Sequence, residues 1–280
     1  MKIKICAAQM EVRFLDVEAN LKKASSMVAE ASREGCDFIC FPEVFLTGLV
    51  GEKISEYAQE IPGEQTAKFS SLAKENGIHI VMGSIVEKEG GNFYNTSVLI
   101  DDSGEILGKY RKINLWNGEK LRRKPGDRTF VFDTKYGKIG IEICWDLAFP
   151  EVSKEMALNG AKIIFCPSLW SREDKYILIK SEEVRRKVPK FDTESNFTDA
   201  CVPARAMENE VVFVYVNGCG KDEFAGSPVN LLGNSQIAVP FYGRVASLIG
   251  KEGLLINEVD LDLLDLAESA YEIKKSSLKK

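Results

Sequence analysis

Histidine is almost absent from this chain, because His79 is the only one among 280 residues. It begins the apolar run 79–86, where a structural role is the simpler explanation. Catalytic triads that use histidine as the base, and metal centres built from several histidines, therefore have little material to work with. Any hydrolytic chemistry here would have to move its protons on carboxylate or lysine side chains.

Long apolar runs and an excess of basic charge are missing as well. The longest apolar stretches, such as 211–216, are far shorter than the roughly 20 residues that span a bilayer. Residues 1–10 alternate polar and apolar side chains, which predicts a strand and not a signal peptide. The 37 Lys and Arg against 42 Asp and Glu give a net charge of -5 with no sustained basic stripe. We expect a cytoplasmic protein with neither a membrane nor a nucleic acid as partner.

The seven cysteines are an odd number, scattered along the chain and mostly within apolar runs: positions 6, 36, 40, 144, 166, 201 and 219. Such a distribution indicates buried thiols in a reducing compartment. Cys36 and Cys40 could form half of a zinc site, but no second pair and no nearby histidine would complete it. We expect no structural metal and no cofactor.

Strand-like and helix-like segments alternate in both halves of the chain, which predicts an α/β fold. The length fits one domain, expected over residues 1–272 and followed by a frayed basic tail over 273–280. The expected helices cover 17–34, 64–76, 150–159 and 197–209. The expected strands cover 2–9, 38–41, 79–87, 95–100, 106–111, 129–134, 138–143, 163–166, 211–216, 235–239, 245–249 and 254–259.

Three reactive side chains fall at the ends of predicted strands. The strand that ends at Cys144 alternates strictly, with isoleucines on one face, and Pro150 opens a helix shortly after. This pattern predicts a tight elbow that presents the sulfur and the next backbone N–H. Taken alone, Cys144 is more often a core residue, and Glu43 and Lys112 are more often solvated surface charges.

Several ordered motifs together resemble the nitrilase superfamily of carbon-nitrogen hydrolases, over nearly the whole chain. The matching segments are 41–43 (Phe-Pro-Glu), 110–112 (Tyr-Arg-Lys), 119–126 with its Glu-Lys and Pro-Gly pairs, 143–146 (Ile-Cys-Trp-Asp), 149–151 (Phe-Pro-Glu), 204–209 and 233–240. Any one of these motifs would be a weak signal, but their order and number make a strong one. The resemblance implies a four-layer α-β-β-α sandwich that forms a homodimer or a higher homo-oligomer.

The resemblance also implies roles for five positions. Cys144 would be the nucleophile that forms a thioester, and Glu43 would shuttle protons. Lys112 and the backbone N–H of Trp145 would stabilise the oxyanion, while Glu119 would hold Lys112 and position the substrate. The scarcity of histidine independently favours a carboxylate base. Two carboxylates near the sulfur should keep the thiol neutral at rest.

Four positions bear on the substrate or on the surroundings of the elbow. Asn114 stands where many members of the superfamily have histidine, Ala148 replaces a frequent arginine, and Arg123 replaces an aromatic residue. These departures alter the side chains available to bind a carboxylate. Glu142 shares a strand face with Cys144, and a buried hydrogen-bonded carboxyl is its simpler explanation.

The elbow resembles those of amidases and carbamoylases more than those of nitrilases, so we expect hydrolysis of a small amide or N-carbamoyl compound. A true nitrilase, a catalytically silent binding or scaffold protein, and a redox-active thiol protein are the alternatives. The acyl group stays open, because its pocket should be lined by loops near 47–57, 114–128 and 171–199. The last of these is unusually charged, which indicates a solvated helix and loop, or alternatively a lid or an oligomer contact.

Overall fold

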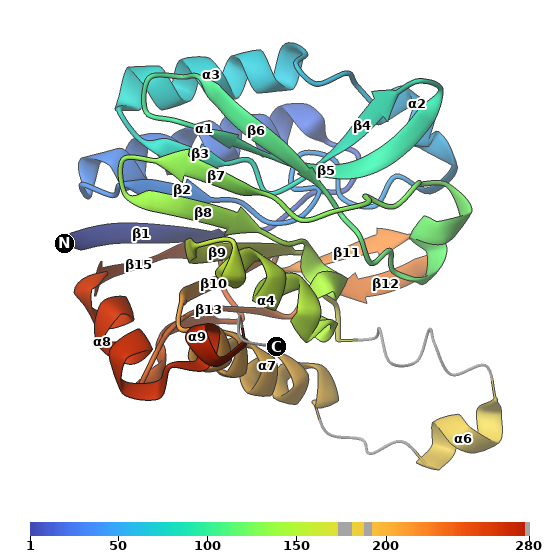
Figure 1. The fold of residues 1–280 in the computed structure, drawn as a ribbon. Coiled ribbons are helices and arrows are strands. Elements are labelled where there is room, and N and C mark those ends of the chain that lie inside the picture. The colour runs from blue at the N-terminus through green and yellow to red at the C-terminus, as the bar shows by residue number, and fades with distance from the viewer. Residues whose placement is uncertain (173–180, 188–191, 278–280) are drawn as a thin grey trace.

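The computed structural model describes residues 1–172, 181–187 and 192–277. Two sheets pack face to face, and helices cover both outer faces (Figure 1). This is the predicted four-layer α-β-β-α sandwich. No helix in the described part of the chain is long and apolar enough to cross a membrane.

The first sheet is mixed and has seven strands. Its order is β15 (Gly253–Asp260), β1 (Lys2–Gln9), β2 (Phe38–Cys40), β3 (His79–Val81), β5 (Asn92–Ile100) and β4 (Ile85–Glu89), with β6 (Ile106–Arg111) also paired to β5. The second sheet has six strands: β14 (Gly243–Ile249), β13 (Gly233–Val239), β10 (Val212–Asn217), β9 (Ala161–Ser168), β8 (Gly137–Ile141) and β7 (Val131–Thr134).

Helices α1 (Val17–Arg33) and α3 (Glu64–Asn76) cover the first sheet, and α4 (Pro150–Leu158) and α7 (Thr193–Asn209) cover the second (Figure 1). The other described α-helices are α2 (Ile54–Tyr57), α6 (Glu182–Lys187), α8 (Asp262–Tyr271) and α9 (Ile273–Ser277). Asp16 begins α1 by accepting a hydrogen bond from the Ala19 backbone at 3.1 Å. The Asp16 side chain thus satisfies one of the unpaired N–H groups at the start of the helix.

Alternation along β1 shows how one strand serves two cores. Ile5 and Ala7 join the apolar layer between the two sheets, whereas Cys6 and Ala8 join the layer beneath α1 and α3. A strand segment buried on both faces needs apolar residues at every position, which explains the apolar run 5–8 within β1. The predicted isoleucine face of β8 likewise lies in the layer between the sheets.

Most predicted elements are present, and the differences have local causes. The strand expected over 79–87 is broken into β3 and β4 because Gly83 takes a left-handed conformation, with φ +50°. The hairpin of β11 (Lys221–Phe224) and β12 (Ser227–Asn230) was not predicted, since its charged residues and Pro228 hide any alternation. Helix α8 was also missed.

Part of the expected frayed tail is ordered, which corrects the prediction for residues 273–277. These residues form α9, and the Ile273 N–H donates to Glu210 at 3.0 Å. The buried Glu210 carboxylate thus satisfies backbone groups at the start of the helix, which a charge-based prediction could not foresee. Residues 278–280 lie outside the described residues.

Gly83 lets two chain segments approach closely beside Glu43. A Cβ atom at this position would lie 1.9 Å from the Pro42 carbonyl oxygen. We expect Gly83→Ala to lower the free energy of unfolding by more than about 2 kcal/mol, through steric clash and left-handed strain. Urea unfolding measures the effect. Gly90→Ala is the control, because Gly90 has φ +57° and no atom within 4 Å of its added Cβ; equal losses in both variants would contradict the close approach.

Candidate active site

Cys144 lies at a strained elbow between β8 and α4. Its φ of +50° is uncommon for a residue other than glycine and costs about 1–3 kcal/mol. The buried Asp146 holds the turn, because its carboxylate accepts hydrogen bonds from the Ile143 N–H at 2.9 Å and the Tyr110 hydroxyl at 2.7 Å. The Asn114 N–H also donates to it at 2.8 Å. The predicted elbow is therefore present and fixed by a carboxylate.

Lys112 is fully buried and lies between two carboxylates. Its Nζ is 2.7 Å from Glu43 Oε1 and 2.7 Å from Glu119 Oε2. Burial alone would lower the pKa of Lys112, but the charges of Glu119 and Glu43 outweigh it and hold that pKa well above its usual value. The ammonium is thus permanently charged at the site.

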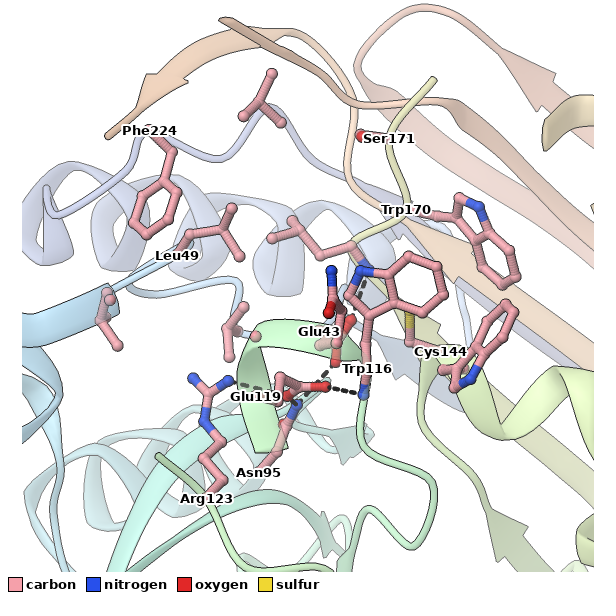
Figure 2. Close-up of a pocket in the computed structure, with 18 of the residues that line it drawn as sticks. Glu43, Leu49, Asn95, Trp116, Glu119, Arg123, Cys144, Trp170, Ser171 and Phe224 are labelled. Carbon is pink, nitrogen blue, oxygen red and sulfur yellow. Dashed lines mark hydrogen bonds and ion pairs between the residues drawn. The ribbon is translucent and has the colours of Figure 1, made fainter. Parts of the chain in front are cut away.

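Both oxygens of Glu43 are held in place. Oε1 accepts from Lys112 and from Asn95 Nδ2 at 2.8 Å, and Oε2 accepts from the Leu169 N–H at 2.9 Å. These donors come from both sheets and fix the carboxylate close enough to Cys144 for its charge to act on the thiol (Figure 2). The Glu43 carboxylate, with both oxygens held by hydrogen bonds, is preorganised to accept one proton.

Glu119 is held by an even larger set of donors. Its carboxylate accepts from Lys112, from Asn95 Nδ2 at 2.8 Å, from the Trp116 N–H at 2.9 Å and from Arg123 Nη1 at 2.9 Å. Burial raises the pKa of Glu119, but Lys112 and Arg123 more than reverse this and bring it to about 2. Glu119 is therefore a fixed anion, suited to hold Lys112 but not to shuttle protons.

The thiol of Cys144 is neutral in this environment. Burial raises its pKa well above the usual value, the Glu43 charge raises it further, and Lys112 offsets only part of the effect. The neutral thiol agrees with the expectation, but its main cause is burial, and of the two expected carboxylates it is Glu43 that adds to the effect. Any reaction of this sulfur as a nucleophile would require removal of that proton, and the Glu43 carboxylate acts on the thiol at close range.

The four predicted side chains Glu43, Lys112, Glu119 and Cys144 all line one cavity of about 650 Å³, together with the predicted oxyanion residue Trp145. His79 is not among the lining residues. It is buried in the first sheet, with its ring 4.8 Å from that of Phe38. The scarcity of histidine predicted a site without a histidine base. The charged groups that act on Cys144 are the Glu43 carboxylate and the Lys112 ammonium.

Sequence reasoning missed several residues of the cavity. Asn95, in the middle of β5, bridges the two carboxylates, and only its polarity within an otherwise buried strand could have drawn attention to it. The hairpin β11–β12 supplies a wall that includes Phe224. The predicted loops 47–57 and 114–128 do contribute lining residues. Of the predicted segment 171–199, Ser171 lines the cavity, whereas 173–180 and 188–191 lie outside the described residues.

The three positions at which the sequence differs from the common family pattern have different roles in the structure. Asn114 supports the elbow through Asp146, and Ala148 ends the 3-10 turn Cys144–Ala148 without placing a charge there. Arg123 enters the cavity and binds Glu119. Only the last of these substitutions adds a charged group to the lining.

The sequence model of the carbon-nitrogen hydrolase family matches residues 4–268 of this chain. This chain belongs to the carbon-nitrogen hydrolase family, within the nitrilase superfamily. It is therefore a carbon-nitrogen hydrolase whose relatives include nitrilases and omega-amidases.

Two relatives and one solved structure illustrate the range of the family. A nitrilase of Pyrococcus abyssi is 32% identical over 269 residues, which cover 94% of this chain and 91% of that protein. An omega-amidase of Xenopus laevis is 32% identical over 263 residues, covering 91% and 87%. An amidase from Nesterenkonia sp. shares the fold, with a TM-score of 0.74, 23% identity and coverage of 98% and 96%. In a variant of that amidase, acrylamide has added to the active-site cysteine.

Glu142 is a second buried carboxyl close to the elbow, on the side that faces α4. Its Oε2 accepts from the Ser153 hydroxyl at 2.5 Å, while Oε1 has no partner among the described residues. Burial raises the pKa of Glu142 to about 8. The expected buried, hydrogen-bonded carboxyl is thus present, and it carries a proton at neutral pH.

This proton makes stability depend on pH. Between about pH 4.5 and 8 the folded protein holds a proton on Glu142 that the unfolded chain releases, so Glu142 lowers the free energy of unfolding as pH rises, by up to about 1.4 kcal/mol per pH unit. We expect Glu142→Gln to remove this decline in urea unfolding measured from pH 5 to 8.

Glu87→Gln is the matched control. Burial opposes ionisation of Glu87, but Arg111 and Lys109 lower its pKa, so its contribution to stability is lost in acid instead. Parallel curves of stability against pH for the wild type and Glu142→Gln would show that Glu142 is ionised in the folded protein.

Proposed function

We propose that this hydrolase cleaves a small amide or N-carbamoyl compound through a thioester on Cys144. The observation that carries the proposal is a buried, neutral thiol near a carboxylate whose two oxygens are held by Lys112, Asn95 and the Leu169 backbone. A thiol needs a base to become a nucleophile at neutral pH, and Glu43 is that base.

In the first half-reaction, Glu43 takes the thiol proton as sulfur attacks the carbonyl carbon. The Lys112 ammonium and the Trp145 backbone N–H stabilise the resulting oxyanion, and loss of one such donor costs about 10²–10³ in rate. Glu43 then gives its proton to the departing nitrogen, which leaves as ammonia or an amine. In the second half-reaction, Glu43 takes a proton from water, which attacks the thioester carbon, and Glu43 returns that proton to the Cys144 sulfur as the acid leaves.

An amide is favoured over a nitrile as substrate by two facts. The omega-amidase and amidase relatives act on amides by name, and the elbow 144–146 resembles those of amidases and carbamoylases. The nitrilase relative makes a nitrile the second candidate. Both substrates would form a covalent bond to the same sulfur, so the products distinguish them.

The test combines ammonia release with mass spectrometry of the enzyme. Primary amides, N-carbamoyl amino acids and nitriles are supplied as a panel. We expect amides or carbamoyl compounds to be turned over, and Cys144→Ala to lose at least about 10⁴-fold in kcat. The wild type should show an acyl adduct on Cys144 during turnover, whereas Glu43→Gln should neither form it from an amide nor release ammonia, because the base for the thiol and the acid for the departing nitrogen are both gone.

Cys201→Ala is the matched control, since Cys201 lies on α7 and is not among the described lining residues. Turnover of nitriles alone would favour the second candidate. Full activity in Cys144→Ala would overturn the mechanism.

We also propose that the protein forms a homodimer through the outer face of the second sheet. Large apolar side chains are exposed together around the edge strand β14 and the adjoining helices: Met207, Phe241, Tyr242, Val245, Ile249 and Tyr271. The rings of Phe241 and Tyr271 lie 5.2 Å apart, which joins the turn before β14 to the end of α8. Exposed apolar patches of this kind mark interaction sites.

Tyr242→Glu combined with Val245→Glu should shift the protein from dimer to monomer, because it places charges in the apolar contact. Light scattering after size-exclusion chromatography measures the mass. Phe130→Glu is the control, since Phe130 is also exposed and directly precedes β7, at the opposite edge of the same sheet. A monomeric wild type, or dissociation of the control as well, would contradict this interface.

A further inference from the structure

Asn95 is a neutral side chain that is bonded to both carboxylates of the site. It lies in the middle of β5, is 1% exposed, and points toward Glu119 and Glu43 (Figure 2). Its Nδ2 donates to Glu43 Oε1 and to Glu119 Oε1, each at 2.8 Å. An amide nitrogen carries two hydrogens, so both are used. Asn95 therefore has no N–H left for a substrate, and any part it takes in the reaction must act through the carboxylates.

The orientation of this amide is fixed by its partners. An ionised carboxylate such as that of Glu119 only accepts hydrogen bonds, so the nitrogen of Asn95 must face it. The Oδ1 atom is buried and has no partner among the described residues. The backbone of Asn95 is tied to the site as well, because its carbonyl accepts from the Lys112 N–H at 2.9 Å. One residue thus holds both carboxylates through its side chain and Lys112 through its backbone.

The two oxygens of Glu43 accept different numbers of hydrogen bonds. Oε1 accepts two, from Asn95 Nδ2 at 2.8 Å and from Lys112 Nζ at 2.7 Å. One described donor reaches Oε2, the Leu169 N–H at 2.9 Å. A carboxylate oxygen has two lone pairs. Both acceptor sites of Oε1 are therefore filled, whereas Oε2 keeps one lone pair that no described group occupies.

The Leu169 N–H also connects Oε2 with the sulfur. Burial raises the pKa of the Cys144 thiol, and the Leu169 N–H opposes this effect by favouring the thiolate. A backbone N–H acts only over a short range, so the two atoms on which it acts, Glu43 Oε2 and Cys144 Sγ, lie close to each other. The unoccupied lone pair of Glu43 is thus on the oxygen beside the thiol.

We propose that Asn95 is a positioning residue that selects the oxygen of Glu43 on which the proton travels. The proposal rests on the role of Glu43 in the proposed function. Because Asn95 and Lys112 fill Oε1, Oε2 takes the thiol proton as the sulfur attacks the carbonyl carbon, and gives it to the nitrogen as the C–N bond breaks. The proton taken later from water returns to the sulfur through the same oxygen. A proton on Oε1 would have to displace one of its two donors.

Neutron diffraction tests the choice of oxygen in the wild type. Crystals are exchanged into D₂O and kept at the acid end of the pH range in which the protein stays folded. We expect the deuteron of Glu43 on Oε2, with Asn95 and Lys112 still donating to Oε1. A deuteron on Oε1, or on neither oxygen, would overturn the proposal. This measurement needs no turnover and no variant.

Asn95→Leu tests the same role during turnover, because leucine has a similar shape and no donor. The variant keeps the backbone bond to Lys112 but frees one lone pair of Glu43 Oε1. We expect kcat to fall about 10- to 100-fold with little change in KM. The acid limb of the kcat/KM profile should move up by about one pH unit, because the ionised carboxylate loses a hydrogen bond. A merely structural role would not move this limb.

Ser97→Ala is the matched control. Ser97 lies two residues further along β5, on the same face, and its buried hydroxyl has no partner among the described residues. Its kcat and acid limb should equal those of the wild type. An equal shift in this control, or an unmoved acid limb in Asn95→Leu, would sink the inference and leave amide hydrolysis standing. Full activity in Cys144→Ala would sink the proposed function, whichever oxygen carries the deuteron. If Asn95→Leu fails to fold in urea unfolding experiments, the neutron measurement on the wild type decides.

Discussion

The ammonium of Lys112, placed 2.7 Å from each of two carboxylates, is the interaction around which the site is built. A buried cation is costly unless it is paired and hydrogen-bonded, and two buried carboxylates would repel each other without it. Asn95 completes the arrangement, because its amide donates to both carboxylates without adding a charge. The position of Glu43 relative to Cys144, and hence the proposed proton transfer, depends on this balance.

The backbone conformation at two positions also fixes the geometry of the site. Gly83 admits the Pro42 carbonyl at a distance that no side chain would tolerate, and Asp146 holds a non-glycine residue in a left-handed turn at Cys144. Both features cost conformational free energy, which the surrounding packing must offset. The site is thus stiff where the reaction takes place, while one wall of its cavity is formed by the hairpin β11–β12.

Periodicity predicted the α/β class, the strand ends at Glu43 and Lys112 and the elbow at Cys144, because these are properties of neighbouring residues. The four-layer architecture and the grouping of these three side chains in one site came from the resemblance to the nitrilase superfamily. Asn95 and the hairpin β11–β12 could not be predicted, since their roles depend on contacts between segments far apart in the chain. The helix at 273–277 was missed for the same reason, because its anchor Glu210 lies elsewhere in the sequence.

Glu43 and Lys112 follow strands of the first sheet, whereas Cys144 follows a strand of the second. Neither sheet contains a complete set of reacting groups, so the site does not exist until the two sheets dock. The appearance of activity during refolding therefore reports the docking of the two sheets. Secondary-structure signals would not register this step. A chain whose two sheets are formed but poorly docked would have native secondary structure and yet no catalytic activity.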